Sequence, residues 1–289
     1  MEKNGEREPM EKPISSDVSA PRPGVRSYFD EHAQPGSRYI TKYTNFFDIY
    51  DRYLESMRDR PIRMIEIGVQ HGGSLQMWKR YLHPDSLIIG IDIYAACKKY
   101  EEEGIQVFIG DQSDAAFLAS VIAEVGQVDF VLDDGSHIPR HQIASFEYLF
   151  RHGLNNGGVY MVEDCFTSYW RRFGGGLRKR GTFIEYSKNV VDELNYWHLE
   201  NPPSSRSWRT DTVEAVEFHS AVVAFRKRPV GKPERIDIGD VKLLDLEAPF
   251  REGKLGELIV RAKRVPMIQA AVRRTPVLWN LMKRVMKDR

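Results

Sequence analysis

The chain has 289 residues, of which 42% are hydrophobic and 29% are charged, and its formal net charge at pH 7 is +1. These values are ordinary for one large globular domain with appendages, and they give no global preference for nucleic acid. The two cysteines, Cys97 and Cys165, cannot form a disulfide framework, and no uninterrupted apolar run approaches the length of a membrane span. We therefore expect a cytoplasmic protein that binds no nucleic acid.

The chain begins with residues 1–37, which contain five prolines among serine, glycine and charged residues. So few apolar side chains cannot offset the entropy cost of ordering, and we expect a flexible N-terminal arm. Residues 39–57 carry aromatic side chains at helical spacing, which predicts an amphipathic helix. Its aromatic face either packs in the core or covers a ligand.

Short apolar runs alternate with helical segments from residue 63 to residue 162. The expected strands are 63–68, 87–93, 105–109, 128–132 and 158–162, and the expected helices start near Leu75 or span 95–103, 114–125 and 140–152. Strands that alternate with helices in this way predict an α/β fold with a doubly wound, Rossmann-like, mostly parallel sheet.

The segment 166–211 changes character, because it is first glycine-rich, basic and aromatic and later rich in proline and serine. We expect it to form a lid with one helix over 184–198. Two further strands, 213–218 and 221–225, are separated by two residues, which predicts an antiparallel hairpin at the sheet edge. The main domain is therefore expected to span residues 38–228.

Residues 229–289 form a predicted C-terminal extension that ends in a basic amphipathic helix. The last 29 residues contain nine lysines and arginines against one aspartate. Such a helix over 265–289 suits contact with an anionic membrane, which would place the protein at the inner membrane face. Docking on the main domain and a dimer contact are the alternatives, and we expect a homo-oligomer.

Two of the predicted strands end in pairs of acids. Asp133 and Asp134 end one strand, Glu163 and Asp164 end the next, and His137 follows the first pair. Because the carboxyl ends of parallel strands meet at one edge, these side chains are expected to converge on one crevice. Carboxylate oxygens suit a hard cation such as Mg²⁺, whereas zinc would call for more histidine or cysteine.

The turn after the first strand reads Gly68-x-x-x-Gly72-Gly73, with Gln70 where a dinucleotide fingerprint has its second glycine. This pattern argues against NAD and suits a nucleoside ligand without a pyrophosphate, such as S-adenosylmethionine. We expect Asp92 to accept the ribose hydroxyls, unless it caps the next helix, and Asp133 to touch the donor or stabilise its loop. The predicted donor-binding residues are Glu66, Gly68, Gly72, Ser74, Asp92, Asp111, Gln112 and Asp133, with Asp111 and Gln112 near the adenine or at the start of a turn.

The segments IEIGVQHGGSLQMW, GIDI, GDQSD, LDDGSH, VEDCFTSYW and FHSAVVAFRK resemble the metal- and S-adenosylmethionine-dependent sugar O-methyltransferases of macrolide biosynthesis and the related rhamnosyl O-methyltransferases. The resemblance covers residues 39–227 and implies a class I methyltransferase fold. It also implies that Asp134, Glu163 and Asp164 hold Mg²⁺, with Mn²⁺ as a second candidate, and that His137 is the general base. A cation lowers the pKa of a bound sugar hydroxyl, and a histidine can then remove its proton.

The expected function is therefore Mg²⁺-dependent methyl transfer to a sugar hydroxyl of a glycosylated natural product or glycolipid. The acceptor is expected to be a small-molecule or lipid-linked glycoside. Three alternatives stay open at this point: O-methylation of a catechol or other phenol, a non-catalytic nucleoside-binding or membrane-recruited protein, and a nicotinamide oxidoreductase.

Overall fold

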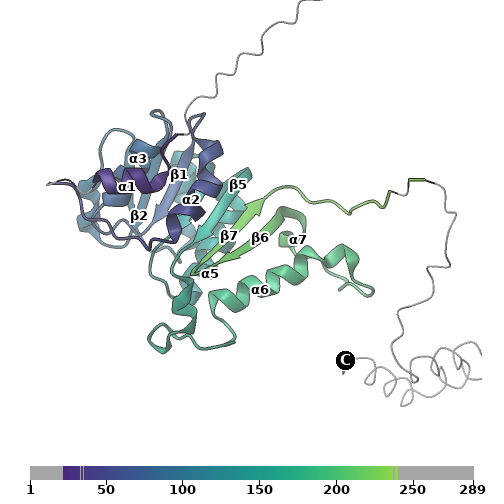
Figure 1. The fold of residues 1–289 in the computed structure, drawn as a ribbon. Helices are drawn as coiled ribbons and strands as arrows, with labels where there is room; N and C mark the ends of the chain where they lie inside the picture. Colours follow the sequence, from purple (N-terminus) through teal and green to yellow (C-terminus); the bar gives the residue numbers. More distant parts are fainter. Residues whose placement is uncertain (1–21, 33, 35, 237, 240–289) are drawn as a thin grey trace, which may run out of the picture. The chain divides into compact units, whose positions relative to one another are not determined.

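The computed structural model describes residues 22–32, 34, 36–236 and 238–239 (Figure 1). Residues 1–233 form one compact unit, which holds every helix and strand named below, and residues 234–289 form a second unit. The predicted basic helix at 265–289 and the first part of the predicted arm lie outside the described residues. Within the described ranges, no helix has the length and apolar character that crossing a bilayer requires.

In the described chain, seven strands form one sheet in the order β3-β2-β1-β4-β5-β7-β6. The strands are β1 (Arg63–Ile67), β2 (Leu87–Asp92), β3 (Ile105–Ile109), β4 (Val128–Asp133), β5 (Leu154–Val162), β6 (Val213–His219) and β7 (Val222–Lys227). The first five strands are parallel, and the β6–β7 hairpin adds two antiparallel strands beside β5. The predicted doubly wound sheet with a terminal hairpin is confirmed, although several strand ends differ by one to four residues.

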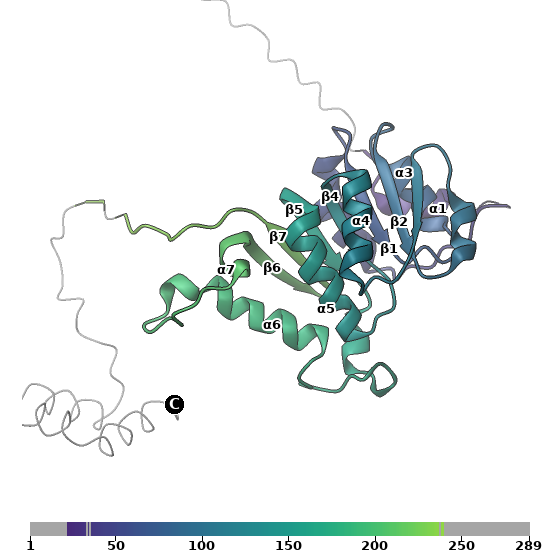
Figure 2. The same cartoon turned by 180° about the vertical axis from the view of Figure 1, so that it is seen from behind.

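Helices cover both faces of the sheet (Figures 1 and 2). One face carries α1 (Val25–His32), α2 (Phe46–Leu54) and α3 (Gly73–Tyr81), and the other carries α4 (Ala115–Val125), α5 (Pro139–Tyr148) and α6 (Phe183–Leu194). The short α7 (Trp208–Thr212) precedes β6, and a π-helical turn, η3 (Leu149–Gly153), extends α5. The 3₁₀ segments are η1 (Glu55–Met57), η2 (Ala95–Tyr100), η4 (Cys165–Tyr169), η5 (Arg171–Phe173) and η6 (Tyr196–His198).

Alternate residues of the parallel strands enter two separate hydrophobic cores. Met64 of β1 packs with the helices of the first face, and its neighbour Ile65 packs with those of the second face. This alternation explains why the strands read as continuous apolar runs, since both faces of a parallel sheet are buried. From β1 the chain runs to β2 and β3 on one side, and it then returns to β4 on the other side of β1, so the strand order reverses between β1 and β4. A crevice for a ligand forms at such a point, beyond the carboxyl ends of the strands.

Helix α1 differs from the prediction, because it falls within the segment 1–37 that was expected to be a flexible arm. The Tyr28 ring packs edge-on against Tyr81 at a centroid distance of 5.4 Å. The Arg58 guanidinium donates hydrogen bonds of 2.9 Å to the Tyr28 hydroxyl and to the backbone oxygen just before α1. The few apolar side chains of this segment are therefore enough to order α1, because they pack on a surface that α2 and α3 already provide.

Candidate active site

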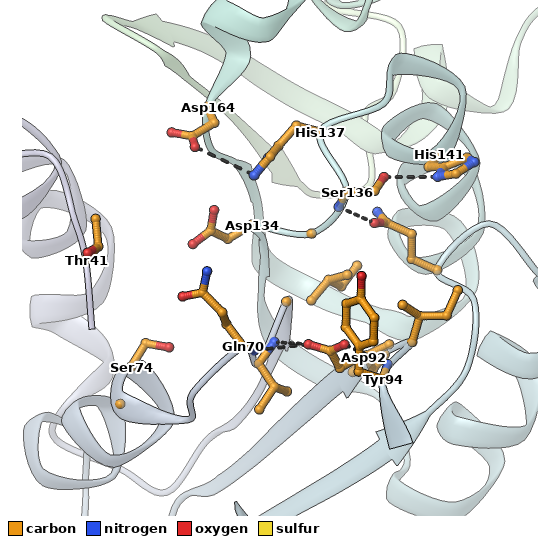
Figure 3. A pocket seen from close by; sticks show the side chains of 18 of the residues that line it. Thr41, Gln70, Ser74, Asp92, Tyr94, Asp134, Ser136, His137, His141 and Asp164 are labelled. Carbon is orange, nitrogen blue, oxygen red and sulfur yellow. Dashed lines mark hydrogen bonds and ion pairs between the residues drawn. The ribbon is translucent and has the colours of Figure 1, made fainter. Parts of the chain in front are cut away.

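A cavity of about 460 Å³ opens at the carboxyl ends of the parallel strands (Figure 3). The residues that follow β1, β2, β3 and β4 line it, together with Asp164 after β5. Residues 39–42 form another part of its wall. This segment was expected to begin a helix, but α2 starts at Phe46, which leaves residues 39–42 free to reach into the crevice.

The glycine turn after β1 is held in place by Asp92. The Asp92 carboxylate accepts hydrogen bonds from the backbone N–H groups of Val69 at 2.9 Å and Gln70 at 3.0 Å, and from Tyr94 at 2.9 Å. Gly68 has a φ of +98°, and a Cβ at this position would overlap the backbone oxygen of Asp134. Glycine is therefore required here by both conformation and space, because a side chain would push apart the turn and the loop after β4.

Five of the eight predicted donor-binding residues line the cavity, namely Gly68, Ser74, Asp92, Asp111 and Gln112. Two of the others support this wall from outside it. Glu66 is buried and does not line the cavity, but it accepts a hydrogen bond of 2.9 Å from the hydroxyl of Ser74, which does. Gly72 caps α3 with a φ of +71°, and a Cβ there would crowd the Tyr100 ring at 2.8 Å.

Asp133, the remaining predicted donor ligand, lies buried outside the cavity. It accepts hydrogen bonds from Gln112 at 3.1 Å, Ser145 at 2.7 Å and Tyr160 at 3.1 Å. Burial raises the pKa of Asp133, and these hydrogen bonds oppose that rise. Gln112 in turn accepts a hydrogen bond of 2.8 Å from the backbone N–H of Ser136. Asp133 therefore stabilises the loop after β4 through Gln112, which was the alternative role considered for it.

Asp134, His137 and Asp164 face one another at one end of the cavity (Figure 3). Each offers one ligand atom, and these atoms lie within 4.8 Å of one another. His137 Nε2 is 3.7 Å from an Asp164 carboxylate oxygen, while buried His137 Nδ1 has no hydrogen-bond partner among the described residues. His137 and Asp164 have φ values of +54° and +52°. Such strained conformations cost about 1–3 kcal/mol each and often mark functional sites.

Lys42, which the sequence reasoning missed, lies next to this group. Its Nζ donates hydrogen bonds of 2.6 Å to Asp134 and 2.9 Å to Glu163, and it lies 3.8 Å from Glu66. The Lys42 side chain is 3% exposed. Glu163 also accepts a hydrogen bond from the Tyr50 hydroxyl. Glu163, a predicted metal ligand, is therefore turned toward Lys42 and Tyr50 and lies outside the Asp134–His137–Asp164 group.

Burial raises the pKa of three acids near Lys42, namely Glu66, Glu163 and Asp164. Burial raises the pKa of Glu66 to about 7 and that of Glu163 to about 8, against the opposing effect of Lys42. Burial and the Asp134 charge likewise raise the pKa of Asp164. Burial lowers the pKa of Lys42, but the charges of Asp134 and Glu163 outweigh it and raise this pKa well above its ordinary value. One ammonium thus faces several buried carboxyl groups, and the excess acids can lose their protons when a cation binds.

The residues fit a hard divalent cation. Two carboxylates from neighbouring strand ends, Asp134 and Asp164, provide oxygen ligands, which Mg²⁺ prefers, and no cysteine of the described chain lies in the group. Among the described residues, the buried atoms His137 Nδ1 and Glu66 Oε1 have no hydrogen-bond partner, although Lys42 Nζ lies 3.8 Å from Glu66 Oε1. The two contacts of Glu163 differ in how far the sequence predicts them. The aromatic spacing of residues 39–57 indicated that Tyr50 lies in a helix. No sequence signal connects Lys42 to Asp134 and Glu163, which lie about 90 and 120 positions later in the chain.

Known proteins with similar sequences are sugar O-methyltransferases. The chain is 39% identical over 192 residues to the 8-demethyl-8-alpha-L-rhamnosyl tetracenomycin-C 2'-O-methyltransferase of Streptomyces olivaceus, covering 62% of this chain and 49% of the relative. It is 40% identical over 183 residues to the demethylmacrocin O-methyltransferase of Streptomyces fradiae, covering 58% and 45%. The chain thus spans about half the length of the curated relatives that it matches. No model of a protein family matches the sequence.

The fold is similar to that of the MycE methyltransferase from the mycinamycin biosynthetic pathway, solved in complex with Mg and SAH. The TM-score is 0.64 at 31% identity, over 72% of this chain and 55% of MycE. A second MycE structure, which also contains mycinamycin VI, gives 0.63 at 32% identity, over 72% and 54%. Over the compared region the chain is therefore homologous to the sugar O-methyltransferases of macrolide and tetracenomycin pathways, as its motifs indicated, and it has their class I methyltransferase fold.

Proposed function

We propose that this protein transfers a methyl group from S-adenosylmethionine to a sugar hydroxyl of a glycosylated small molecule, in a reaction that depends on Mg²⁺. The observation that carries the proposal is that one cavity joins the glycine turn and Asp92 to the Asp134–His137–Asp164 group. A methyl donor and an acceptor hydroxyl need to meet at such a junction. The homologues and MycE with Mg, SAH and mycinamycin VI support the same reaction.

The acids at the strand ends would hold the cation. We propose Asp134 and Asp164 as ligands, with Glu163 as the predicted third ligand once it exchanges its contact with Lys42 for the metal. When bound, a divalent cation lowers the pKa of a coordinated hydroxyl. Removal of the hydroxyl proton would be carried out by a side chain of the protein.

His137 is proposed as the general base. Its Nε2 lies beside Asp164, but 3.7 Å is longer than a hydrogen bond, so this nitrogen remains available to accept a proton. The hydroxyl oxygen would attack the methyl carbon, the bond from that carbon to sulfur would break, and the hydroxyl proton would move to Nε2. The carboxylate of Asp164 would stabilise the resulting imidazolium by its charge. The products are then a methyl ether and S-adenosylhomocysteine.

Calorimetry and a methylation assay test this proposal. We expect the purified protein to bind S-adenosylhomocysteine, and we expect methyl transfer to a rhamnosyl glycoside to stop with chelator and resume with Mg²⁺. Turnover that survives both His137→Ala and Asp134→Ala would contradict the assigned roles. Methylation of catechol in place of the glycoside would favour the phenolic alternative.

The protein is also proposed to bind a second copy of itself and an anionic membrane. We propose a homo-oligomer, which light scattering tests, and membrane contact through residues 265–289, which lie outside the described residues. A chain that ends at Gly256 should lose flotation with anionic liposomes. Equal flotation of the full and shortened chains would contradict the membrane proposal.

A further inference from the structure

A row of aromatic rings runs outward from His137. Its members are Phe173, Trp170, Phe166 and Tyr43, here called the ring row. Successive centroid distances, starting from the His137 ring, are 6.3, 6.1, 4.6 and 5.6 Å. Tyr43 is 52% exposed and Trp170 is 39% exposed, so the row presents apolar surface to solvent beside the cavity. Contiguous exposed apolar side chains at such a place indicate a binding surface.

The segment that carries most of the ring row is built as a fixed platform. It consists of η4 and η5, followed by a glycine turn that folds back over them, between β5 and α6 (Figure 1). The N–H groups of Gly175 and Gly176 donate hydrogen bonds of 2.9 Å to the backbone oxygens of Trp170 and Ser168. A Cβ on Gly175 would overlap the Ser168 oxygen, so the return of the chain requires glycine. A platform formed in advance avoids the ordering cost of binding.

Five basic residues lie in this platform or shortly after it in the chain. They are Arg171, Arg172, Arg178, Lys179 and Arg180, and the sequence has no acid between Cys165 and Ile184. All five are exposed, and none of them forms an ion pair with another described residue. The Arg172 guanidinium carbon lies 4.4 Å from the Trp170 ring centroid and 5.1 Å from that of Phe173. Arg172 therefore brings a positive charge to the end of the ring row that adjoins His137.

On the basis of the methyl transfer proposed above, we propose that the acceptor is a glycoside that carries a phosphate ester. The apolar C–H face of its sugar packs on the ring row, because the negative faces of aromatic rings attract polarised C–H groups. Its phosphate binds Arg172, whose planar guanidinium can donate two parallel hydrogen bonds to phosphate oxygens. The lack of acids in this segment means that no carboxylate of the platform competes for the guanidinium.

Calorimetry with two matched probes tests the proposal. Rhamnose 1-phosphate and methyl rhamnoside share the sugar and differ in the phosphate, and each is titrated into protein with S-adenosylhomocysteine and Mg²⁺. We expect the phosphate ester to bind at least about tenfold more tightly, as one charge-assisted interaction provides. Equal affinity of the two probes would overturn the proposal. Thymidine diphosphate rhamnose and an alkyl rhamnosyl phosphate then distinguish a nucleotide source of the phosphate from a lipid source.

Variants separate the two parts of the site. Arg172→Gln should reduce the phosphate preference to about twofold or less, because it removes the charge beside the sugar. Phe166→Leu should weaken both probes equally and keep the preference, because Phe166 belongs to the ring row while Arg172 lies on Trp170 and Phe173. The control is Arg206→Gln, since Arg206 is also an exposed arginine that stacks on a tryptophan, at 4.8 Å from Trp197. A preference that survives Arg172→Gln would overturn the assignment. Uptake of S-adenosylhomocysteine, measured first, shows separately whether the donor site itself exists.

Discussion

Replacing Lys42 with methionine is expected to destabilise the protein and to strengthen its response to Mg²⁺. Methionine retains the length of the buried side chain but removes the ammonium that lies 2.6 Å from Asp134 and 2.9 Å from Glu163. Two charge-assisted hydrogen bonds are lost, and removal of one partner of a buried ion pair costs about 3–5 kcal/mol. We expect a loss near the lower limit below neutral pH, because a proton can neutralise Glu163, whose pKa burial raises to about 8.

The loss of stability should grow with pH. A carboxyl group whose pKa is raised in the folded state stabilises that state below its unfolded pKa, and this contribution is lost as the pH rises through the folded pKa. In the wild type this loss levels off above the pKa values of about 7 for Glu66 and about 8 for Glu163. Without Lys42 both values are higher, so the variant continues to lose about 1.4 kcal/mol per pH unit for each such group.

Urea unfolding with and without saturating Mg²⁺, at about pH 6 and about pH 8.5, measures both effects. Mg²⁺ should stabilise Lys42→Met more than it stabilises the wild type, because the metal no longer competes with an ammonium. Lys227→Met is the matched control, since Lys227 is buried but donates to the backbone oxygens of Arg151 and Leu154. It should lose stability without a change in the Mg²⁺ effect. If Mg²⁺ stabilises Lys42→Met no more than it stabilises the wild type, the reasoning that Lys42 and the metal compete for the same carboxylates is refuted.

The remaining predictions concern the base, the glycine turn and the acids. His137→Asn should lower kcat by about 10²–10⁴-fold, while the binding of S-adenosylhomocysteine is retained. The control is His152→Asn, which should leave kcat unchanged because His152 is exposed. Equal kcat values for the two variants would contradict the role of His137 as general base. Gly68→Ala should lower the free energy of unfolding in urea clearly more than Gly157→Ala does. Gly157 has a φ of +85° but no atom near the position of a Cβ, so its replacement costs only about 1–2 kcal/mol of backbone strain. Mg²⁺ affinity should rise from about pH 6 to about pH 8.5, because Glu163 must lose its proton to bind, and a flat calorimetric profile would exclude this.

The sheet and the meeting of the main acids were predictable from the sequence. Strands buried on both faces read as apolar runs, and an acid directly after such a run must lie at the carboxyl edge. This rule placed Asp92, Asp134 and Asp164 at one edge, and the structure lines one cavity with all three. The glycine spacing, with Gln70 where a second glycine would stand, separately argued against a dinucleotide fingerprint, and Gln70 has a φ of +50°.

The orientation of neighbouring acids could not be deduced in the same way. Asp133 and Asp134 are adjacent, yet one points into the core toward Tyr160 and the other lines the cavity. The same holds for Glu163, which contacts Lys42, and Asp164, which faces His137. Alternation along a strand predicts that one acid of each pair turns away, but which one depends on where the strand ends: β4 ends at Asp133, whereas β5 ends at Val162, before both of its acids.

The segment 38–42 escaped the sequence reasoning because its role depends on contacts that no local pattern encodes. Its backbone lies against Gly73, where a Cβ would overlap the oxygens of Arg38 and Tyr39. Arg38 also forms an ion pair of 2.8 Å with Glu102 beyond β2, while Lys42 reaches the acids after β4 and β5. One short segment thus contacts both the glycine turn and the acid cluster. Loss of the contact between Lys42 and Glu163 when a cation binds would therefore alter the wall of the proposed donor pocket, so donor and metal binding should be thermodynamically coupled.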